Sequence, residues 1–375
     1  MPHWELLKRS PSKRIYVYDV ISGRLAQRQI AKVYGRVNLY RNMKNPSDVD
    51  YLEHKLADLE REASHIIRNI HLSLPLGSIT LAREQLATLR KFIFVMHYRH
   101  DAVSTTCFHE DNPSNASIRD WIQRYKERHQ LQTEVDVWLE GLKYYLETPH
   151  QTIIATGEDL RERYGNGRFF EMLSKRFDPD IEELYAIEYE SMANYFFLGV
   201  WEAAEDTEFV LSGNGFGVWE GLIYGNPGAH RIYVVSPRIA LILRRTCFHQ
   251  PHSNDPSILS SSLAGIPISR PVIKYVNKER LTNHDQDNPL LATYRNTPEA
   301  QKDTFTFTFT KLSRQQTYAV NGVIMTNANQ SSITFSRPDA MLSTLEVYMD
   351  SHTTFDEDKR SSFQPLRVQL AQMPI

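Results

Sequence analysis

The feature that most constrains the fold is a run of apolar residues spaced three and four apart in the first quarter of the chain. The run consists of Leu52, Leu56, Leu59, Ala63, Ile66, Ile67 and Ile70. This spacing puts apolar side chains on one face of a helix, and here it continues for about five turns. Ser47 and Asp50 form a weak capping box before the run, and Pro75 and Gly77 end it. The sequence therefore predicts a long amphipathic helix between Ser47 and Pro75.

Weaker patterns predict the remaining elements. Residues 14–20 alternate and are rich in β-formers, which predicts a strand. Apolar spacing and segment length predict further helices at about Thr80–Arg99, 117–129, 132–147, 157–176 and 181–204. After residue 206 the runs become short and β-rich, at Glu208–Leu211, Arg231–Val235 and the alternating Thr304–Thr310. Residues 249–271 are rich in proline and serine and predict a long surface loop.

These elements predict an α+β fold that is mainly helical with a smaller mixed β element. We expect a single large domain over residues 1–350, with a helical part at about 47–204 and a β-containing part at about 205–348. Residues 351–375 are expected to form a poorly ordered tail.

The composition is close to that of an average soluble globular protein. The chain has 375 residues, of which 41% are hydrophobic and 23% are charged. No run approaches the roughly 18 apolar residues of a membrane span, and no secretory signal begins the chain, so no membrane association is expected. Two cysteines point to a reducing compartment, and we expect a cytoplasmic protein.

A near-neutral net charge of −2 hides two segments of opposite charge. Ten basic residues and one acid between Lys8 and Lys44 give that segment a charge of +9. Nineteen acids and six bases between Glu134 and Glu220 give −13. The basic segment is either a contact for nucleic-acid phosphates or a solvated face. The acidic stretch is either an ordinary helix surface or a source of carboxylates for a cationic ligand, such as a guanidinium group.

Three carboxylates form the first candidate site, Glu158, Asp159 and Glu162. Residues three and four apart share a helix face, and crowded carboxylates raise one another's pKa, so the group is a candidate general base. The alternative is that acids favour the first turn of a helix because of its dipole. His150, which follows a proline, is either a base or a structural histidine.

A short duplication and a glycine-rich turn are the other candidates. Thr-Cys-Phe-His occurs twice and supplies Cys107, His109, Cys247 and His249, the ligand set of a tetrahedral zinc site. Chance, with each cysteine a small buried hydrophobe, is the leading alternative. The turn at 212–217 is either a backbone cradle for a ligand or a tight hairpin. Arg99 is either a buried anchor or a helix C-terminal cap.

The order of several segments resembles a known family. The segments are Ile15–Asp19, Leu52–Ala63, Thr148–His150, Met192–Trp201, Glu208–Ser212, Gly217–Gly221 and His230–Pro237. In this order, over about residues 15–350, they resemble a large, mostly fungal family of domains of unknown function that includes the arginine-containing cyclodipeptide synthases. Those enzymes take arginine and a second amino acid from aminoacyl-tRNAs and close a diketopiperazine.

The resemblance implies an enzyme of this type. Asp159 and Glu162 would then be acid/base residues, and Glu158 would help to bind the guanidinium group. Asn214 and Glu220, at the glycine-rich turn, and Arg99 would bind the substrate. Aminoacyl-tRNA would contact the basic segment 8–44. No cofactor or metal is expected, because the aminoacyl ester is already activated and no ATP-binding loop is present.

Three departures and two alternatives accompany this hypothesis. The synthases carry Asp-Asp-x-x-Glu, whereas this chain has glutamate at the first of these positions, Glu158. Relatives also carry a His- and Pro-containing motif before the first strand, of which this chain lacks a clear copy. Many relatives have an aspartate near the glycine-rich turn, where this chain has Gly213 and Asn214. The alternatives are a metal-dependent nuclease or phosphoester hydrolase, and a non-catalytic binding protein.

Overall fold

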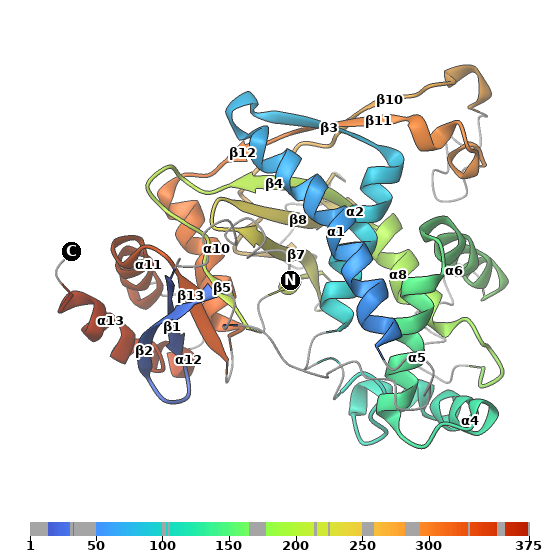
Figure 1. Ribbon diagram of the computed structural model, residues 1–375, viewed down its shortest axis with the longest axis horizontal. Coiled ribbons are helices and arrows are strands. Elements are labelled where there is room, and N and C mark those ends of the chain that lie inside the picture. The colour runs from blue at the N-terminus through green and yellow to red at the C-terminus, as the bar shows by residue number, and fades with distance from the viewer. Residues whose placement is uncertain are drawn as a thin grey trace.

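A mixed six-stranded sheet lies between two layers of helices (Figure 1). The computed structural model describes residues 14–30, 33, 50–99, 103, 106–164, 178–213, 216–223, 226–249, 259–281, 293–328, 331–350 and 357–373. The strand order is β12-β4-β8-β7-β6-β9, and only β12 and β4 run parallel. The strands are β4 (Phe196–Glu202), β6 (Val218–Ile223), β7 (Asn226–Ser236), β8 (Ile239–Arg245), β9 (Leu259–Ser260) and β12 (Thr310–Lys311). The predicted α+β class is confirmed.

Alternate residues of the central strands face different helix layers. On β7, Tyr233 and Val235 pack into one hydrophobic cluster with the first helix layer, whereas Ile232 and Val234 pack into a second cluster on the opposite face. This follows from the two-residue repeat of a strand. Both faces of the sheet are therefore buried, and each position on β7 is assigned to one layer by its place in the alternation.

The first layer consists of helices from the first half of the chain. The long helix α1 (Tyr51–Leu72) is the one predicted from the apolar run, and its buried residues are the seven apolar residues of that run. The other helices of this layer are α2 (Arg83–Tyr98), α4 (Arg119–His129), α5 (Glu134–Glu147), α6 (His150–Tyr164) and α8 (Leu184–Asn194). They surround a core rich in aromatic side chains.

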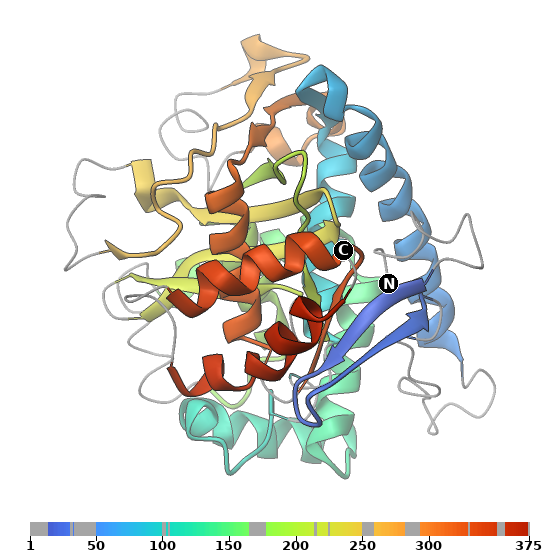
Figure 2. The same cartoon turned by 90° about the vertical axis from the view of Figure 1, so that its left-hand side faces the viewer.

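The second layer is built from segments near both ends of the chain. It contains the four-stranded sheet β2-β1-β13-β5 and the helices that pack on it (red and orange in Figure 2). The strands are β1 (Arg14–Asp19), β2 (Arg24–Gln29), β5 (Leu211–Ser212) and β13 (Ser332–Phe335). The helices are α10 (Arg314–Thr326), α11 (Pro338–Asp350), α12 (Glu357–Ser361) and α13 (Gln364–Ala371). The predicted strand at residues 14–20 is confirmed as β1.

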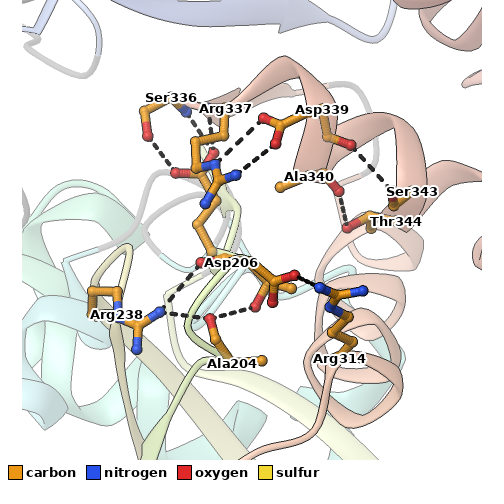
Figure 3. A network of polar contacts seen from close by, with 12 residues as sticks. Ala204, Asp206, Arg238, Arg314, Ser336, Arg337, Asp339, Ala340, Ser343 and Thr344 are labelled. Atoms are coloured by element: carbon orange, nitrogen blue, oxygen red, sulfur yellow. Dashed lines mark hydrogen bonds and ion pairs between the residues drawn. The ribbon is translucent and has the colours of Figure 1, made fainter.

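A polar network fastens this second layer to the loop after β4 (Figure 3). The carboxylate of Glu208 accepts the backbone N–H groups of Ser336 and Arg337, both at 2.7 Å, just before α11 begins. Arg238 donates to the carbonyl of Ala204 at 2.6 Å, and Arg314 of α10 pairs with Asp206. Glu208 is buried, and these hydrogen bonds fix the course of the chain just before α11 begins.

A third sheet and several short 3₁₀ helices complete the fold. The strands β10 (Val272–Lys274), β11 (Thr304–Thr308) and β3 (Ser78–Ala82) pair in that order. Phe305 and Phe307 of β11 are buried, which confirms the predicted half-buried strand. The 3₁₀ helices are η2 (Leu74–Leu76), η3 (Pro113–Ile118), η4 (Thr246–His249), η5 (Lys278–Arg280), η7 (Tyr294–Asn296) and η8 (Ala300–Lys302).

Several element boundaries were predicted wrongly. The helix expected at 181–204 ends at Asn194, and residues 196–202 form the central strand β4, buried along its whole length. A strand that is covered on both faces shows a continuous apolar run instead of alternation, so its sequence does not distinguish it from a buried helix. The helix expected from Thr80 begins at Arg83 and follows strand β3.

The glycine-rich turn does not form the predicted hairpin. Strand β5 before it pairs with β13, whereas β6 after it pairs with β7. The turn therefore links two sheets. Gly217 is needed at its end, because its φ is +80° and a Cβ there would lie 2.8 Å from Nδ1 of His97.

The tail was also predicted wrongly for the residues that the structure describes. Phe363, Leu366 and Leu370 are buried in the second hydrophobic cluster, and Gln369 donates to the carbonyl of Gly23 in the β1–β2 turn at 2.9 Å. Helix α13 is thus part of the folded core. Across the described ranges, every helix is too short or too polar to cross a membrane.

We expect Leu366→Ala to lower the free energy of unfolding by about 2–5 kcal/mol, because the substitution leaves a cavity where Leu366 is 0% exposed. Val368→Ala on the same helix is the matched control, since Val368 is 48% exposed and its loss costs about 0.5 kcal/mol or less. Urea denaturation of both variants measures the difference. Equal stability of the two variants would show that α13 is not docked.

Candidate functional site

A cavity of about 360 Å³ opens between the first helix layer and the central sheet. Its volume is in the range typical of small-molecule sites, about 300–1,000 Å³. Residues from α2, α5, α8, β4, β6 and β7 line it. Six aromatic rings line it, namely Tyr98, Phe108, Tyr145, Tyr185, Phe196 and Trp219. We refer to this space as the aromatic cavity.

The tyrosines of the wall are held in place by hydrogen bonds to the backbone. Tyr145 donates to the carbonyl of Tyr185 at 2.7 Å, Tyr185 donates to Val137 at 2.8 Å, and Tyr98 donates to Trp138 at 3.2 Å. Gly141 of α5 makes room for this packing, because a Cβ there would lie 2.3 Å from the hydroxyl of Tyr98. The cavity is therefore preformed, and these hydroxyl groups already have acceptors.

Arg231 is the unusual residue of the cavity. The alternation along β7 turns it toward the helices, beside Tyr233, and it is 1% exposed. Its Nε–H donates to the carbonyl of Gly217 at 3.3 Å, and Nη1 contacts Sδ of Met192 at 3.1 Å. The guanidinium group stacks on Trp219, with its central carbon 4.4 Å from the ring centre. Nη2 is buried and has no hydrogen-bond partner among the described residues.

Four further polar side chains line the cavity, namely Cys107, Asn115, Glu188 and Ser191. Glu188 and Ser191 come from α8, and Glu188 is exposed as well as lining, so it lies where the cavity meets solvent. Cys107 is half-buried. Burial, and to a smaller extent the charge of Glu188, raise the pKa of the Cys107 thiol to about 12. The thiol is therefore protonated at neutral pH, which is unfavourable for a nucleophile.

The predicted carboxylate group does not share one environment. Glu158 turns inward from α6 and pairs with Arg295, and it also accepts from the amide of Asn194 at 3.0 Å. Beside it lies a buried ion pair between Arg161 and Glu190. These contacts join α6, α8 and the 3₁₀ helix η7. Glu158 is thus part of a buried ionic network outside the aromatic cavity.

Asp159 and Glu162 face solvent instead. The side chain of Asp159 is 60% exposed and pairs with Arg163 one turn later, and Glu162 is exposed. The two acids were expected in the first turn of a helix, but α6 begins at His150, so the helix dipole does not explain their position. The expected convergence of Glu158, Asp159 and Glu162 in one pocket is therefore wrong. A catalytic role for any of them stays a prediction.

Glu220 lies on the opposite face of the sheet from the aromatic cavity. Its neighbour Trp219 points to the cavity, so the alternation of β6 turns Glu220 away. The carboxylate accepts from Nδ1 of His230 at 2.8 Å and from the Ser262 backbone at 2.7 Å. Arg244 donates to Nε2 of His230 at 2.7 Å, so this histidine is neutral and carries its hydrogen on Nδ1. Glu220 therefore does not line the aromatic cavity, and a substrate-binding role for it stays a prediction.

This second network has consequences for protonation. Burial would raise the pKa of Glu220, but the hydrogen bonds from His230 and Ser261 lower it below its ordinary value. Burial lowers the pKa of His230, and burial lowers that of Arg244 to about 10. Because Nε2 of His230 accepts from Arg244, it has no free lone pair to activate a serine hydroxyl. The network anchors the loop at 261–266 to the sheet.

The other predicted residues are placed only in part. Arg99 is the C-cap of α2 and pairs with Glu60 of α1 at 2.9 Å, and it does not line the aromatic cavity. Asn214 lies outside the described residues. Of the predicted zinc ligands, Cys107 lines the cavity and the side chain of His109 is 53% exposed, whereas the side chains of Cys247 and His249 lie outside the described residues. Among the described residues, no group of three or more potential metal ligands occurs.

Sequence reasoning overlooked Arg231 and Glu188. A signal for Arg231 was present, since the arginine directly precedes the apolar run Ile232–Val235 in a segment that reads as a central strand. Such a charge is costly unless it has a partner or a ligand. Glu188 had no signal of its own among the many acids of the helical part.

The family of the chain is shown by comparison with known proteins. A family profile described as a protein of unknown function, DUF4238, matches residues 3–339. The chain belongs to the DUF4238 family. The match spans nearly the whole chain, as expected for a single family of unknown function, and carries no activity with it. No curated protein and no solved structure matches the chain.

His150, the first residue of α6, makes the stability of the folded protein depend on pH. It is half-buried, and its Nδ1 lies 2.6 Å from the hydroxyl of Tyr189. Burial, together with the charges of Arg90 and Lys91, lowers the pKa of His150 to about 3. The unfolded chain takes up a proton below about pH 6.5, whereas the folded protein does not. Stability is therefore complete above pH 6.5 and is lost as the pH falls below it.

We expect His150→Gln to remove up to about 2 kcal/mol of the stability difference between pH 8 and pH 5. Urea denaturation at both pH values measures this difference. Part of the wild-type dependence should remain, because burial also lowers the pKa of His230. His109→Gln, at an exposed histidine, is the control and should keep the full difference. An unchanged difference in His150→Gln would show that the residue titrates normally in the folded protein.

Proposed function

We propose that the aromatic cavity binds an amino-acid-derived substrate and that the protein is an arginine-using cyclodipeptide synthase. The observation that carries the proposal is a cavity with six aromatic rings and one carboxylate, Glu188, at its opening. A guanidinium group stacks on aromatic faces and pairs with carboxylates, so this combination suits an arginyl side chain. Glu188 belongs to the acidic middle of the chain, for which a source of carboxylates for a cationic ligand was one of the two interpretations.

The proposed reaction needs positioning more than activation. The α-amino group of one aminoacyl ester attacks the ester carbonyl of the other, which forms a peptide bond and releases one tRNA 3′-hydroxyl. The free amino group of the dipeptidyl ester then attacks its own ester carbonyl, which closes the diketopiperazine and releases the second tRNA. A rigid cavity that holds the esters in reach lowers the entropic part of this barrier. Each amine must lose a proton to a general base before it attacks.

The basic segment supports a tRNA partner. Within it, Arg14, Arg24 and Arg28 are exposed on the β1–β2 hairpin. Exposed arginines that bind phosphates release counterions, so they contribute affinity that falls with salt. Aminoacyl-tRNA is a cytosolic substrate, and we propose the cytoplasm as the site of action.

We expect Glu188→Gln to lower the yield of cyclo-arginyl dipeptides by about tenfold or more, because a charged hydrogen bond to the guanidinium is lost. The measurement is mass spectrometry of extracts from a host that expresses each variant. Glu127→Gln is the control, since that side chain is 68% exposed on α4, and it should leave the yield unchanged. Soluble wild-type protein that forms no such product, in cells or with arginyl-tRNA in vitro, would contradict the proposal. Loss of product in Asp159→Asn or Glu162→Gln, but not in Glu188→Gln, would move the chemistry to α6.

A second variant tests the tRNA partner separately. Replacing Arg14, Arg24 and Arg28 by alanine should weaken tRNA binding and reduce the slope of log affinity against log salt by about two to three. Replacing Arg61, Arg124 and Arg280, which are also exposed, gives a matched loss of charge elsewhere. Filter binding between low and moderate salt measures both slopes. Equal slopes in the two triple variants would show that the hairpin does not contact phosphates.

A further inference from the structure

The buried charge of Arg231 is poorly compensated by the protein. A guanidinium group has five N–H donors and requires acceptors or counter-charge when it leaves water. Here one donor has a backbone carbonyl at 3.3 Å, and another has the thioether of Met192, which is a weak acceptor. Nη2 has no hydrogen-bond partner, and no ion pair joins Arg231 to a carboxylate, within the part of the chain that the structure describes.

Packing holds the guanidinium in place despite this cost. One face stacks on Trp219, and the sheet position between Gly217 and Met192 fixes the side chain. A buried donor without a partner costs about 1–3 kcal/mol, and more when it is charged. Leucine or methionine at this position would avoid that cost. The arrangement is thus unfavourable for stability. It suits a binding site in which a ligand supplies the missing hydrogen-bond acceptor.

We propose that Arg231 is a binding residue for the carboxyl group of the cavity's ligand, as a free carboxylate or as the carbonyl of an ester. The inference rests on the proposed function in taking the aromatic cavity as the substrate site. A carboxyl group fits better than a phosphate. Arg231 offers one positive charge and one nitrogen without a partner, which suits an acceptor group that is planar and carries at most one negative charge. Glu188 lies at the opening of the cavity. The carboxyl group of a bound arginine would then face Arg231, and its guanidinium group would face Glu188.

Binding of L-arginine and agmatine to the full chain tests the inference. The two compounds share the guanidinium and amino groups, and only arginine has the carboxylate. By isothermal titration calorimetry we expect wild-type protein to bind arginine at least about tenfold more tightly than agmatine. In Arg231→Met this ratio should fall to about one while the affinity for agmatine is kept.

Controls separate folding from binding. Arg231→Met should melt at the wild-type temperature or above it, because it removes an uncompensated buried charge. Should it fail to fold, Arg231→Lys serves in its place and should also lower the ratio, since lysine lacks the planar fork. Arg61→Met, at an exposed arginine, should keep the wild-type ratio.

Binding of phenylacetate and of neutral phenylacetamide is measured in the same way. The two compounds share an aromatic ring and only phenylacetate has a carboxylate, so they test Arg231 without the arginine side chain. Equal wild-type affinity for arginine and agmatine would overturn the role of Arg231 and leave the proposed function standing. Absence of binding by both, with phenylacetate bound by wild type and not by Arg231→Met, would support Arg231 and overturn the arginine substrate. Absence of binding by every probe would overturn the inference.

Discussion

The alternation of side chains along β6 and β7 is the constraint on which the site depends. Both faces of the central sheet are buried, so each residue of these strands belongs to one layer or the other. Trp219 and Arg231 consequently face the helices and line the aromatic cavity. Glu220 and His230, one residue away on each strand, face the second layer and are bonded to each other. A slip of one residue in either strand would exchange the two sets and place a carboxylate network where the cavity now is.

The buried polar groups on the two faces of the sheet differ in how their charges are compensated. Glu220, His230 and Arg244 satisfy one another in a continuous chain of hydrogen bonds, and this chain ties the loop at 261–266 to the sheet. Such a network fixes the local structure and leaves few free hydrogen-bond donors or acceptors for a ligand. Arg231 has a weak acceptor on one nitrogen and none on another among the described residues. This contrast, within one sheet, is why we propose Arg231, and not the Glu220 network, as the ligand-binding group.

Much of the fold followed from the sequence, whereas the site did not. The seven apolar residues of α1, the strand β1 and the alternating β11 were readable because each buries a single face at a fixed period. Strand β4 was missed because burial on both faces removes the period, and α13 because its docking depends on residues more than 300 positions away, such as Gly23. The acids of α6 looked like a site because they are adjacent in sequence, but local spacing does not reveal which of them turns inward toward Arg295. Residues of the cavity come from α2, α5, α8 and three strands, and only the tertiary fold brings them together.

The central claim is that the aromatic cavity holds a ligand by its carboxyl group at Arg231. A crystal structure of the protein with bound L-arginine tests this most directly. The account predicts a carboxylate oxygen within about 3 Å of Nη2 of Arg231, the geometry of a charged hydrogen bond, with the guanidinium end of the ligand directed toward Glu188. Arginine bound elsewhere, or bound in the cavity with its carboxylate in solvent and Nη2 still unpartnered, would contradict it.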